Sequence, residues 1–293
     1  MFAMDVTEAP DTCAFDALFK KSVPHILEKI FFTLDYESFK ICKKVSNPWN
    51  ELLTSESFKQ MGKSVFQENI EEELHQASMD GNLKQLRSIL SSGIVDINRI
   101  GGRYDGAPLH YSSWRGHKDV VQLLLDAGAE PNKEDKKGFT PLYPAAVVGH
   151  KDVVLLLLDR GADPKKGGGH GRGLNPLLGA SCYGHKDVVQ LLVDRGVDPN
   201  KEKEDGATPL HLAAQKGYKL VVQLLLDRGA EPDHANIHGW TPLHEASYEG
   251  HKEVIQLLLI RGADRNNLSV DGRTPLSLAL IRGHADTVNI LQG

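Results

Sequence analysis

The stretch DGATPLHLAAQKGYKLVVQLLLDRGAEPD, residues 205–233, carries the pattern that decides the fold, because close variants of it recur along most of the chain. Thr208 and Pro209 are typical of a helix start: a Thr hydroxyl can accept from free backbone N–H groups, and a proline at the first helical position loses no hydrogen bond. Gly217 and Gly229 stand where left-handed backbone ends two successive helices. One copy therefore predicts a helix, a turn, a second helix and a loop.

The length of the repeat can be measured from the proline of Thr-Pro-Leu-His and its counterparts. These prolines stand in steps of 33, 35, 33, 33 and 33 residues: Pro108, Pro141, Pro176, Pro209, Pro242 and Pro275. A 33-residue period with the motif T-P-L-H-x-A resembles the ankyrin repeat, whose helix pairs must stack because one pair cannot bury both its apolar faces. The resemblance implies an all-α fold, an ankyrin-repeat solenoid of about seven helix-turn-helix repeats. The array is expected over residues 71–293, with a degenerate first repeat at 71–101 and further repeats from about 102, 135, 170, 203, 236 and 269.

Several copies depart from the repeat pattern. Ala107 replaces the capping threonine, which should cost about 1 kcal/mol, whereas Asn175 at the same place can still cap its helix. Pro144 stands in the first turn of its helix, where it should delete one backbone hydrogen bond and distort the chain near Tyr143. The last copy carries polar residues in place of apolar ones, which predicts a polar C-terminal cap that faces water. These residues are Thr287, Asn289 and Gln292.

The N-terminal part of the chain differs from the repeats in its composition and in the spacing of its apolar residues. Residues 1–20 are acidic and rich in small side chains, which favours a flexible leader. Residues 21–53 predict three short amphipathic helices, and residues 54–70 predict a helical connector to the repeats. Helices in a segment of about thirty residues rarely bury enough surface to fold alone, so their apolar stripes require another surface.

The order and spacing of these apolar residues resemble the F-box, the helical motif by which substrate receptors dock on the Skp-family adaptor of cullin-RING ubiquitin ligases. The usual leading Leu-Pro is Val23-Pro24 here, and Pro48 before Trp49 departs from the pattern. By this resemblance, the adaptor-binding residues are Pro24, Ile26, Leu27, Ile30, Phe31, Leu34, Phe39, Val45 and Trp49. An alternative is that residues 22–66 only cap the ankyrin stack.

The two resemblances together imply a non-catalytic substrate-recognition subunit of an SCF-type cullin-RING ubiquitin ligase. Its F-box-like segment would dock the Skp-family adaptor, and its ankyrin groove would bind an unidentified target protein, with the chain monomeric within the complex. The alternative function is a non-catalytic ankyrin scaffold or adaptor in signalling.

Partner-binding residues are expected just before each Thr-Pro and just before the glycine that ends each first helix. Those places hold many aromatic and basic side chains, the types that dominate interface energetics. The predicted groove residues are Tyr104, Trp114, Arg115, Lys137, Phe139, Arg172, Tyr183, Lys216, Trp240, Tyr248, Arg273 and Arg282. An alternative role for Trp114 and Trp240 is packing between repeats.

The composition narrows the classes of partner and compartment. A net charge of -5 and a pI near 6.2 provide no basic field for nucleic-acid phosphates. Three scattered cysteines indicate neither a disulfide framework nor a metal pair. The N-terminus lacks the pattern of a signal peptide, and no apolar run is long enough to span a membrane. A cytoplasmic or nuclear protein is expected.

Eight of the 13 histidines follow the repeat and not a catalytic pattern. Three follow Pro-Leu, namely His110, His211 and His244, and these are expected to tie loops to helices by hydrogen bonds. Five others follow a helix-ending glycine. The glycine-rich stretch 167–173 matches no phosphate-binding motif and is expected to be a mobile loop tip. No enzymatic activity, cofactor or metal is therefore expected.

Overall fold

The computed structural model describes residues 70–91, 93 and 95–293, and residues 74–293 form one compact unit. The predicted leader, the F-box-like segment and all but the last residue of the predicted connector lie outside the described residues.

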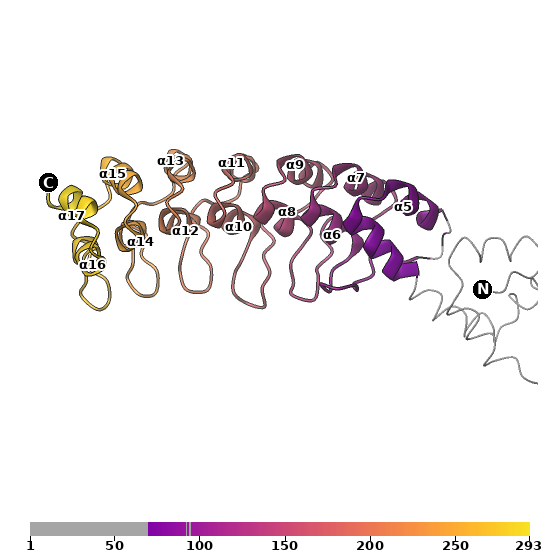
Figure 1. The fold of residues 1–293 in the computed structure, drawn as a ribbon, viewed down its shortest axis with the longest axis horizontal. Helices are drawn as coiled ribbons and strands as arrows, with labels where there is room; N and C mark the ends of the chain where they lie inside the picture. The colour runs from indigo at the N-terminus through magenta and orange to yellow at the C-terminus, as the bar shows by residue number, and fades with distance from the viewer. Residues whose placement is uncertain (1–69, 92, 94) are drawn as a thin grey trace, which may run out of the picture. The chain divides into compact units, whose positions relative to one another are not determined.

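The repeat region consists of seven helix pairs, which confirms the predicted ankyrin-repeat solenoid (Figure 1). The first pair is formed by residues 70–80 and α5 (Leu83–Leu90). The other pairs are α6 (Pro108–Arg115) with α7 (Lys118–Asp126), α8 (Leu142–Val148) with α9 (Lys151–Asp159), α10 (Pro176–Cys182) with α11 (Lys186–Asp194), α12 (Pro209–Gln215) with α13 (Lys219–Asp227), α14 (Pro242–Glu249) with α15 (Lys252–Ile260), and α16 (Pro275–Arg282) with α17 (Ala285–Gln292).

The helices lie in two layers, and the loops between repeats extend beyond them. In Figure 1 the second helices of the pairs, α5 to α17 in odd numbers, form one row, and the first helices form the row beside it. Each loop that connects two repeats extends on the side of the first helices; we call these loops the fingers. The first helices and the fingers therefore border a common surface.

One leucine in each repeat shows how the stack is held together. The leucine of the Thr-Pro-Leu motif is fully buried or nearly so in α6, α8, α10, α12 and α14, and a leucine of the second helix is fully buried at its own repeated position. Burying such a side chain stabilises a fold by roughly 2 kcal/mol. Because the same positions recur every repeat, the core is continuous along the array.

Each glycine that ends a first helix also makes room for the next repeat. Gly217 has φ +74°, and a Cβ built on it would lie 2.7 Å from Nδ1 of His251. The Nε2 of His251 is 2.9 Å from the carbonyl oxygen of Gln215, so the ring donates a hydrogen bond back to the preceding repeat. The same arrangement recurs at His117, His150, His185 and His284.

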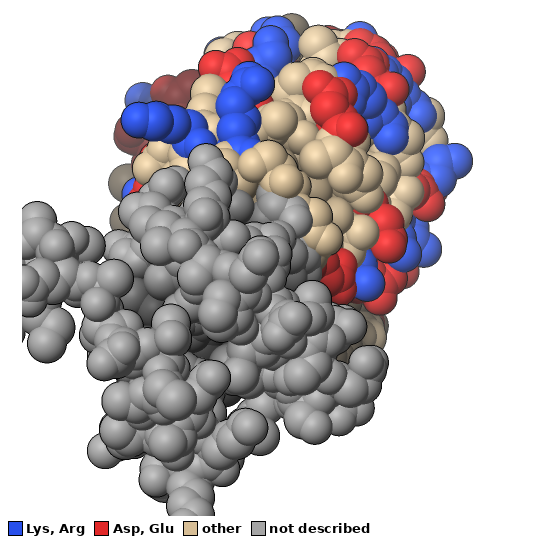
Figure 2. Space-filling model, turned by 90° about the vertical axis from the view of Figure 1, so that its right-hand side faces the viewer, with Lys and Arg blue, Asp and Glu red and all other residues tan. Residues whose placement is uncertain are grey.

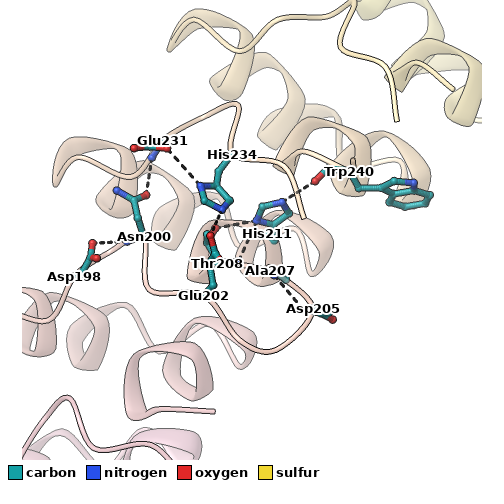
Figure 3. Close-up of polar contacts among 10 residues, drawn as sticks. All are labelled: Asp198, Asn200, Glu202, Asp205, Ala207, Thr208, His211, Glu231, His234 and Trp240. Atoms are coloured by element: carbon teal, nitrogen blue, oxygen red, sulfur yellow. Dashed lines mark hydrogen bonds and ion pairs between the residues drawn. The ribbon is translucent and has the colours of Figure 1, made fainter. Parts of the chain in front are cut away.

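The Pro-Leu histidines join neighbouring repeats, as the sequence predicted. Nε2 of His211 lies 2.9 Å from the carbonyl oxygen of Trp240, and Nδ1 accepts from the backbone N–H of Thr208 at 3.1 Å (Figure 3). The Thr208 hydroxyl lies 2.8 Å from the same Nδ1. Thr208 and His211 thus form a capping box at the start of α12, and the Thr208 hydroxyl also contacts the histidine ring. Thr274 also caps its helix in the predicted way.

Three repeats differ from this pattern where their first helix begins, and local hydrogen bonding explains each difference. Ala107 lacks the hydroxyl, but its N–H still donates to Nδ1 of His110 at 3.1 Å, which preserves part of the joint. Asn175 caps α10 through its side chain, which accepts from the N–H of Leu178 at 2.9 Å. Near Pro144, α8 begins at Leu142, one residue later than its counterparts begin. The missing N–H of proline explains this delay.

The C-terminal repeat corrects one part of the predicted polar cap. Asn289 and Gln292 are exposed, but Thr287 is only 1% exposed, because it occupies the buried position that Val120 holds in α7. Leu280 is 57% exposed at a place where earlier repeats bury Ser113 or Ala146. The outer surface of the last repeat is therefore only partly polar.

Neighbouring fingers are joined by backbone hydrogen bonds near their tips. The N–H of Glu204 donates to the carbonyl of Arg172, and that of Ile237 donates to the carbonyl of Asp205, each at 3.0 Å. The glycine-rich finger is held in the same way, since Gly169 donates to Lys137 at 2.8 Å. This finger is thus attached to its neighbour, in contrast to the mobile tip predicted. A Cβ at Gly168 would come within 2.6 Å of the Gly138 carbonyl oxygen, so glycine permits the close approach.

The described surface carries charges of both signs. Figure 2 shows Lys and Arg interspersed with Asp and Glu and with uncharged residues over the part of that face which is not grey. A face of mixed charge gives no continuous field for a phosphate backbone.

A candidate protein-binding groove between first helices and fingers

Two neighbouring pockets lie between the first helices and the fingers of repeats three to seven. The first, which we call the apolar pocket, has a volume of about 640 Å³. It is lined by Tyr143, Arg172, Leu174, Leu178, Gly179, Cys182, Tyr183, Lys203, Glu204, Asp205, Leu212 and Ile237. Tyr183 and Ile237 are 57% and 62% exposed, and both lie in the lining of this one pocket.

The apolar pocket owes part of its depth to Gly179. The residue after the Pro-Leu-His motif is Leu212 in α12 and Glu245 in α14, but in α10 the equivalent place holds Gly179. A Cβ there would lie 2.8 Å from Cγ2 of Val147 on α8. Glycine therefore allows α8 and α10 to approach and leaves space above them.

The second pocket, which we call the acidic pocket, has a volume of about 450 Å³. It is lined by Gln215, Asn236, His238, Trp240, Glu245, Tyr248, Glu249, Val270 and Asp271. These residues come from α12, α14 and the fingers of the sixth and seventh repeats. Three of them are carboxylates, and no Lys or Arg is among its lining residues.

Burial changes the proton affinity of one carboxyl in the acidic pocket. The pKa of Glu245 is raised to about 7, chiefly because burial disfavours the charged form. A hydrogen bond from Gln215 at 3.1 Å opposes this shift, and the negative charges of Glu249 and Asp205 add to it. Glu245 therefore exchanges its proton near neutral pH.

Aromatic rings stand beside these carboxylates. The rings of Trp240 and Tyr248 have centroids 5.4 Å apart, and the Arg282 guanidinium lies 4.5 Å from the centroid of Tyr248. The indole of Trp240 points away from the His211 hydrogen bonds (Figure 3). Trp240 also contacts His244 of its own repeat, at 6.3 Å between centroids. Its ring contacts are thus made within its own repeat.

A second aromatic group lies at the other end of the groove. Trp114 is 36% exposed and meets the ring of Tyr104 edge-on, with centroids 5.3 Å apart. The Arg115 guanidinium lies 5.8 Å from the Trp114 ring. Phe139 stacks on Tyr143 at 4.0 Å. Exposed aromatic and arginine side chains are therefore gathered on this surface.

The structure brings together some of the predicted groove residues and separates others. Arg172 and Tyr183 line the apolar pocket, and Trp240 and Tyr248 line the acidic pocket. Lys137 and Lys216 are exposed but line neither pocket, and Arg273 is paired with Asp271 at 2.8 Å.

The sequence reasoning missed the residue that follows each Pro-Leu-His motif. Leu212 and Glu245 both stand there and reach the pockets, as does Gly179. The signal was available, because this place changes from Tyr111 to Pro144, Gly179, Leu212, Glu245 and Leu278 along the copies. Finger residues such as Ile237 and Asp271 were missed because their position depends on how neighbouring fingers pack.

The histidines in this region are suited to structure and not to acid–base chemistry. Burial lowers the pKa of His110 and His244, and it lowers that of His211 to about 4. Each ring is therefore neutral at physiological pH, and its Nε2 is held by a carbonyl oxygen of the next repeat. No group of three metal-ligating side chains stands close enough together to bind a metal ion in the described part of the chain. Within the same part, every helix is too short or too polar to cross a membrane.

Comparisons with known proteins agree with this architecture. A family model described as ankyrin repeats (3 copies) matches residues 74–168, 165–236 and 229–293. The human ASB11 ankyrin repeat domain has a similar crystal structure, with a TM-score of 0.68 and 29% identity over 75% of this chain and 97% of that one.

Curated relatives match over shorter stretches. A probable E3 ubiquitin-protein ligase, XBOS32 of Oryza sativa subsp. japonica, is 37% identical over 76 residues, which is 25% of this chain and 15% of the relative. The palmitoyltransferase AKR1 of Lachancea kluyveri is 37% identical over 70 residues, 24% of this chain and 9% of the relative. This chain thus spans a small part of the length of these relatives. The family model, in contrast, covers nearly all of the described residues, and the chain belongs to the ankyrin-repeat family.

Proposed function

We propose that the chain is the substrate-recognition subunit of an SCF-type cullin-RING ubiquitin ligase, in which the repeat array binds the target protein. Ankyrin repeats are protein–protein interaction modules, and this general role follows from the family. The proposal adds that the groove receives the target and that residues 21–53 dock the Skp-family adaptor. It assigns no catalytic step to the chain itself.

The observation that carries the target-binding part is the pair of pockets on the finger side of the first helices. Large exposed side chains, among them Tyr183 and Ile237, line a cavity of about 640 Å³ that joins residues from three successive fingers. Interfaces are enriched in aromatic and arginine side chains that fill pockets.

The adaptor-docking part rests on the order of apolar residues in the F-box-like segment. Pro24, Ile30, Leu34 and Trp49 keep the spacing of that motif. The test is copurification of the full chain with a Skp-family adaptor. We expect a stable complex that Ile30→Asp combined with Leu34→Asp abolishes, because two buried charges would oppose docking. Leu220→Asp is the matched control, since Leu220 is 60% exposed on α13.

Either of two results would overturn adaptor docking. One is the absence of a complex between the unaltered chain and the adaptor. The other is a complex that withstands the Ile30→Asp and Leu34→Asp exchange. In both cases the scaffold function, which uses the array alone, becomes the better description.

The groove is tested by the set of proteins that the full chain captures. We expect Tyr183→Ala with Ile237→Ala to remove the specific partners, because both side chains line the apolar pocket. Ile260→Ala is the control, since Ile260 is 79% exposed on α15 in the second-helix layer. Capture that is unchanged by the first variant would show that partners use another surface.

A further inference from the structure

The acidic pocket differs from the rest of the groove in its chemistry. Its lining combines the carboxyl groups of Glu245, Glu249 and Asp271 with the rings of Trp240 and Tyr248. Glu249 is exposed, whereas Glu245 is half-buried. Carboxylates attract a cation at close range, and aromatic faces attract the same cation through their quadrupole.

We propose that the acidic pocket is the subsite that receives an arginine side chain of the bound target protein. The occupant is identified by charge complementarity, because three carboxyl groups line the pocket and no Lys or Arg does. The planar guanidinium can stack on an indole while its N–H groups donate to a carboxylate. A volume of about 450 Å³ is ample for one such side chain.

The protein contains an internal example of this recognition. Arg282 of α16 places its guanidinium 4.5 Å from the centroid of Tyr248, within the range of a cation–π contact. Arg273 likewise pairs with Asp271, with 2.8 Å between Nε and the carboxylate. The rim of the pocket therefore already holds guanidinium groups. Glu249 is exposed, and Glu245, which accepts a hydrogen bond from Gln215, has further lone pairs for a partner.

The protonation of Glu245 makes the subsite sensitive to pH. Because its pKa is raised to about 7, the carboxyl is mostly protonated at pH 6 and mostly ionised at pH 8. Asp271 stays ionised over this range, since the Ser269 hydroxyl bonds to it and holds its pKa below the usual value. Affinity for a cation should therefore rise with pH. The other titratable or charged groups around Glu245 are Glu249 on α14, Lys203 and Asp205 on the fifth finger, His238 on the sixth, Arg273 on the seventh and Arg282 on α16.

The test uses the full chain and a small probe, N-acetylargininamide, followed by the NMR signals of the tryptophan indole N–H groups. We expect the Trp240 signal to shift at millimolar probe, while the Trp114 signal, at the far end of the groove, stays in place. N-acetylglutaminamide is the neutral control and should shift neither signal. N-acetyllysinamide separates guanidinium recognition from attraction to any cation, and we expect it to bind more weakly.

Two variants assign the effect to the pocket. Glu245→Gln should weaken N-acetylargininamide binding at least about fivefold at pH 8 and reduce the rise in affinity between pH 6 and pH 8. This variant should fold normally, because a glutamine amide can replace a carboxyl that is readily protonated. Glu253→Gln on α15 makes the same charge change on an exposed part of the second-helix layer, and it should leave binding unchanged. A melting curve for each variant verifies folding.

The proposal is overturned if the probe does not shift Trp240, if the neutral probe shifts it equally, or if Glu245→Gln binds as tightly as the unaltered chain. The subsite rests on the proposed groove function, but the two fail separately. Captured partners that depend on Tyr183 and Ile237, with no arginine binding, would keep the groove and remove the subsite. If the chain binds arginine but Tyr183→Ala with Ile237→Ala leaves its captured partners unchanged, the subsite is kept and the groove function is removed.

Discussion

At the scale of single residues, the histidine after Pro-Leu explains why the motif recurs. His211 links its own helix start to the carbonyl of the next finger, and this requires a neutral ring that accepts at Nδ1 and donates at Nε2. Protonation would turn the Nδ1 acceptor into a donor that faces the N–H of Thr208. The motif is therefore a structural joint whose strength depends on pH.

This joint predicts a loss of stability in acid. The pKa of His211 is near 4 in the folded chain and near 6.5 when unfolded, so between these values the unfolded state binds more protons and stability falls as pH falls. The loss between pH 7 and pH 5 should be about 2 kcal/mol from His211. The lowered pKa values of His110 and His244 also reduce stability as the pH falls. Urea unfolding at several pH values measures the effect.

A control for this loss of stability is a variant in which the fifth repeat copies the helix start of the fourth. There Asn175 caps the helix and Leu178 replaces the histidine. Thr208→Asn with His211→Leu should copy that arrangement and reduce the acid sensitivity by the share of one histidine. An unchanged dependence on pH would exclude His211 as a source.

At the scale of elements, the helix-ending glycines differ in what surrounds them. Gly217 and Gly229 both have positive φ, but only Gly217 lies against a ring of the next repeat. Sequence pattern alone gives both the same role. The packing of one first helix on the next repeat separates them.

This difference predicts unequal costs for two identical exchanges. Gly229→Ala should cost about 1 kcal/mol, the strain of a left-handed alanine, because nothing lies within 4 Å of the new methyl group. Gly217→Ala should cost about 2 kcal/mol more, since the methyl group would overlap the His251 ring and displace its hydrogen bond. Chemical denaturation of both variants measures the difference. Equal losses would mean that backbone strain alone sets the cost.

At the scale of the whole repeat region, each unit is held by its neighbours. Besides the buried leucines, a row of ion pairs joins successive second helices along the stack. The pairs are Arg160 with Asp126 at 2.9 Å, Arg195 with Asp159 at 2.8 Å, Arg228 with Asp194 at 3.3 Å, and Arg261 with Asp227 at 2.7 Å. These side chains are partly exposed, so each pair contributes little alone and salt screens it.

The row of ion pairs between second helices predicts a melting temperature that depends on salt concentration. Replacing the four arginines by glutamine should lower the melting temperature by a few degrees in about 0.01 M salt and by much less in about 1 M salt. Differential scanning calorimetry at both salt concentrations measures this. The control is a chain in which one pair is exchanged, with Asp194→Arg and Arg228→Asp. The two charges still attract each other in this variant. A loss of equal size at both salt concentrations would attribute the effect to packing of the arginine stems.

The sequence by itself determined the repeat, its period, the helix starts and ends, and the role of the Pro-Leu histidines. It could do so because these features depend on local rules of capping, left-handed glycine and apolar spacing that act within about 33 residues. It also placed Trp240 and Tyr248 on the surface between the first helices and the fingers, where both line the acidic pocket. These two residues occupy positions that vary between copies while the scaffold around them does not.

Only the tertiary structure decided that Thr287 is buried and that Glu245 stands in a pocket with Trp240. Both facts depend on the stacking of one repeat on another. Burial at the end of the array depends on which repeat packs against it. The acidic pocket is formed by side chains of two successive fingers and two helices. A local pattern contains no distance between such residues. The chemistry of the groove is therefore a property of the stack, although each repeat in it follows a pattern that can be read from the sequence alone.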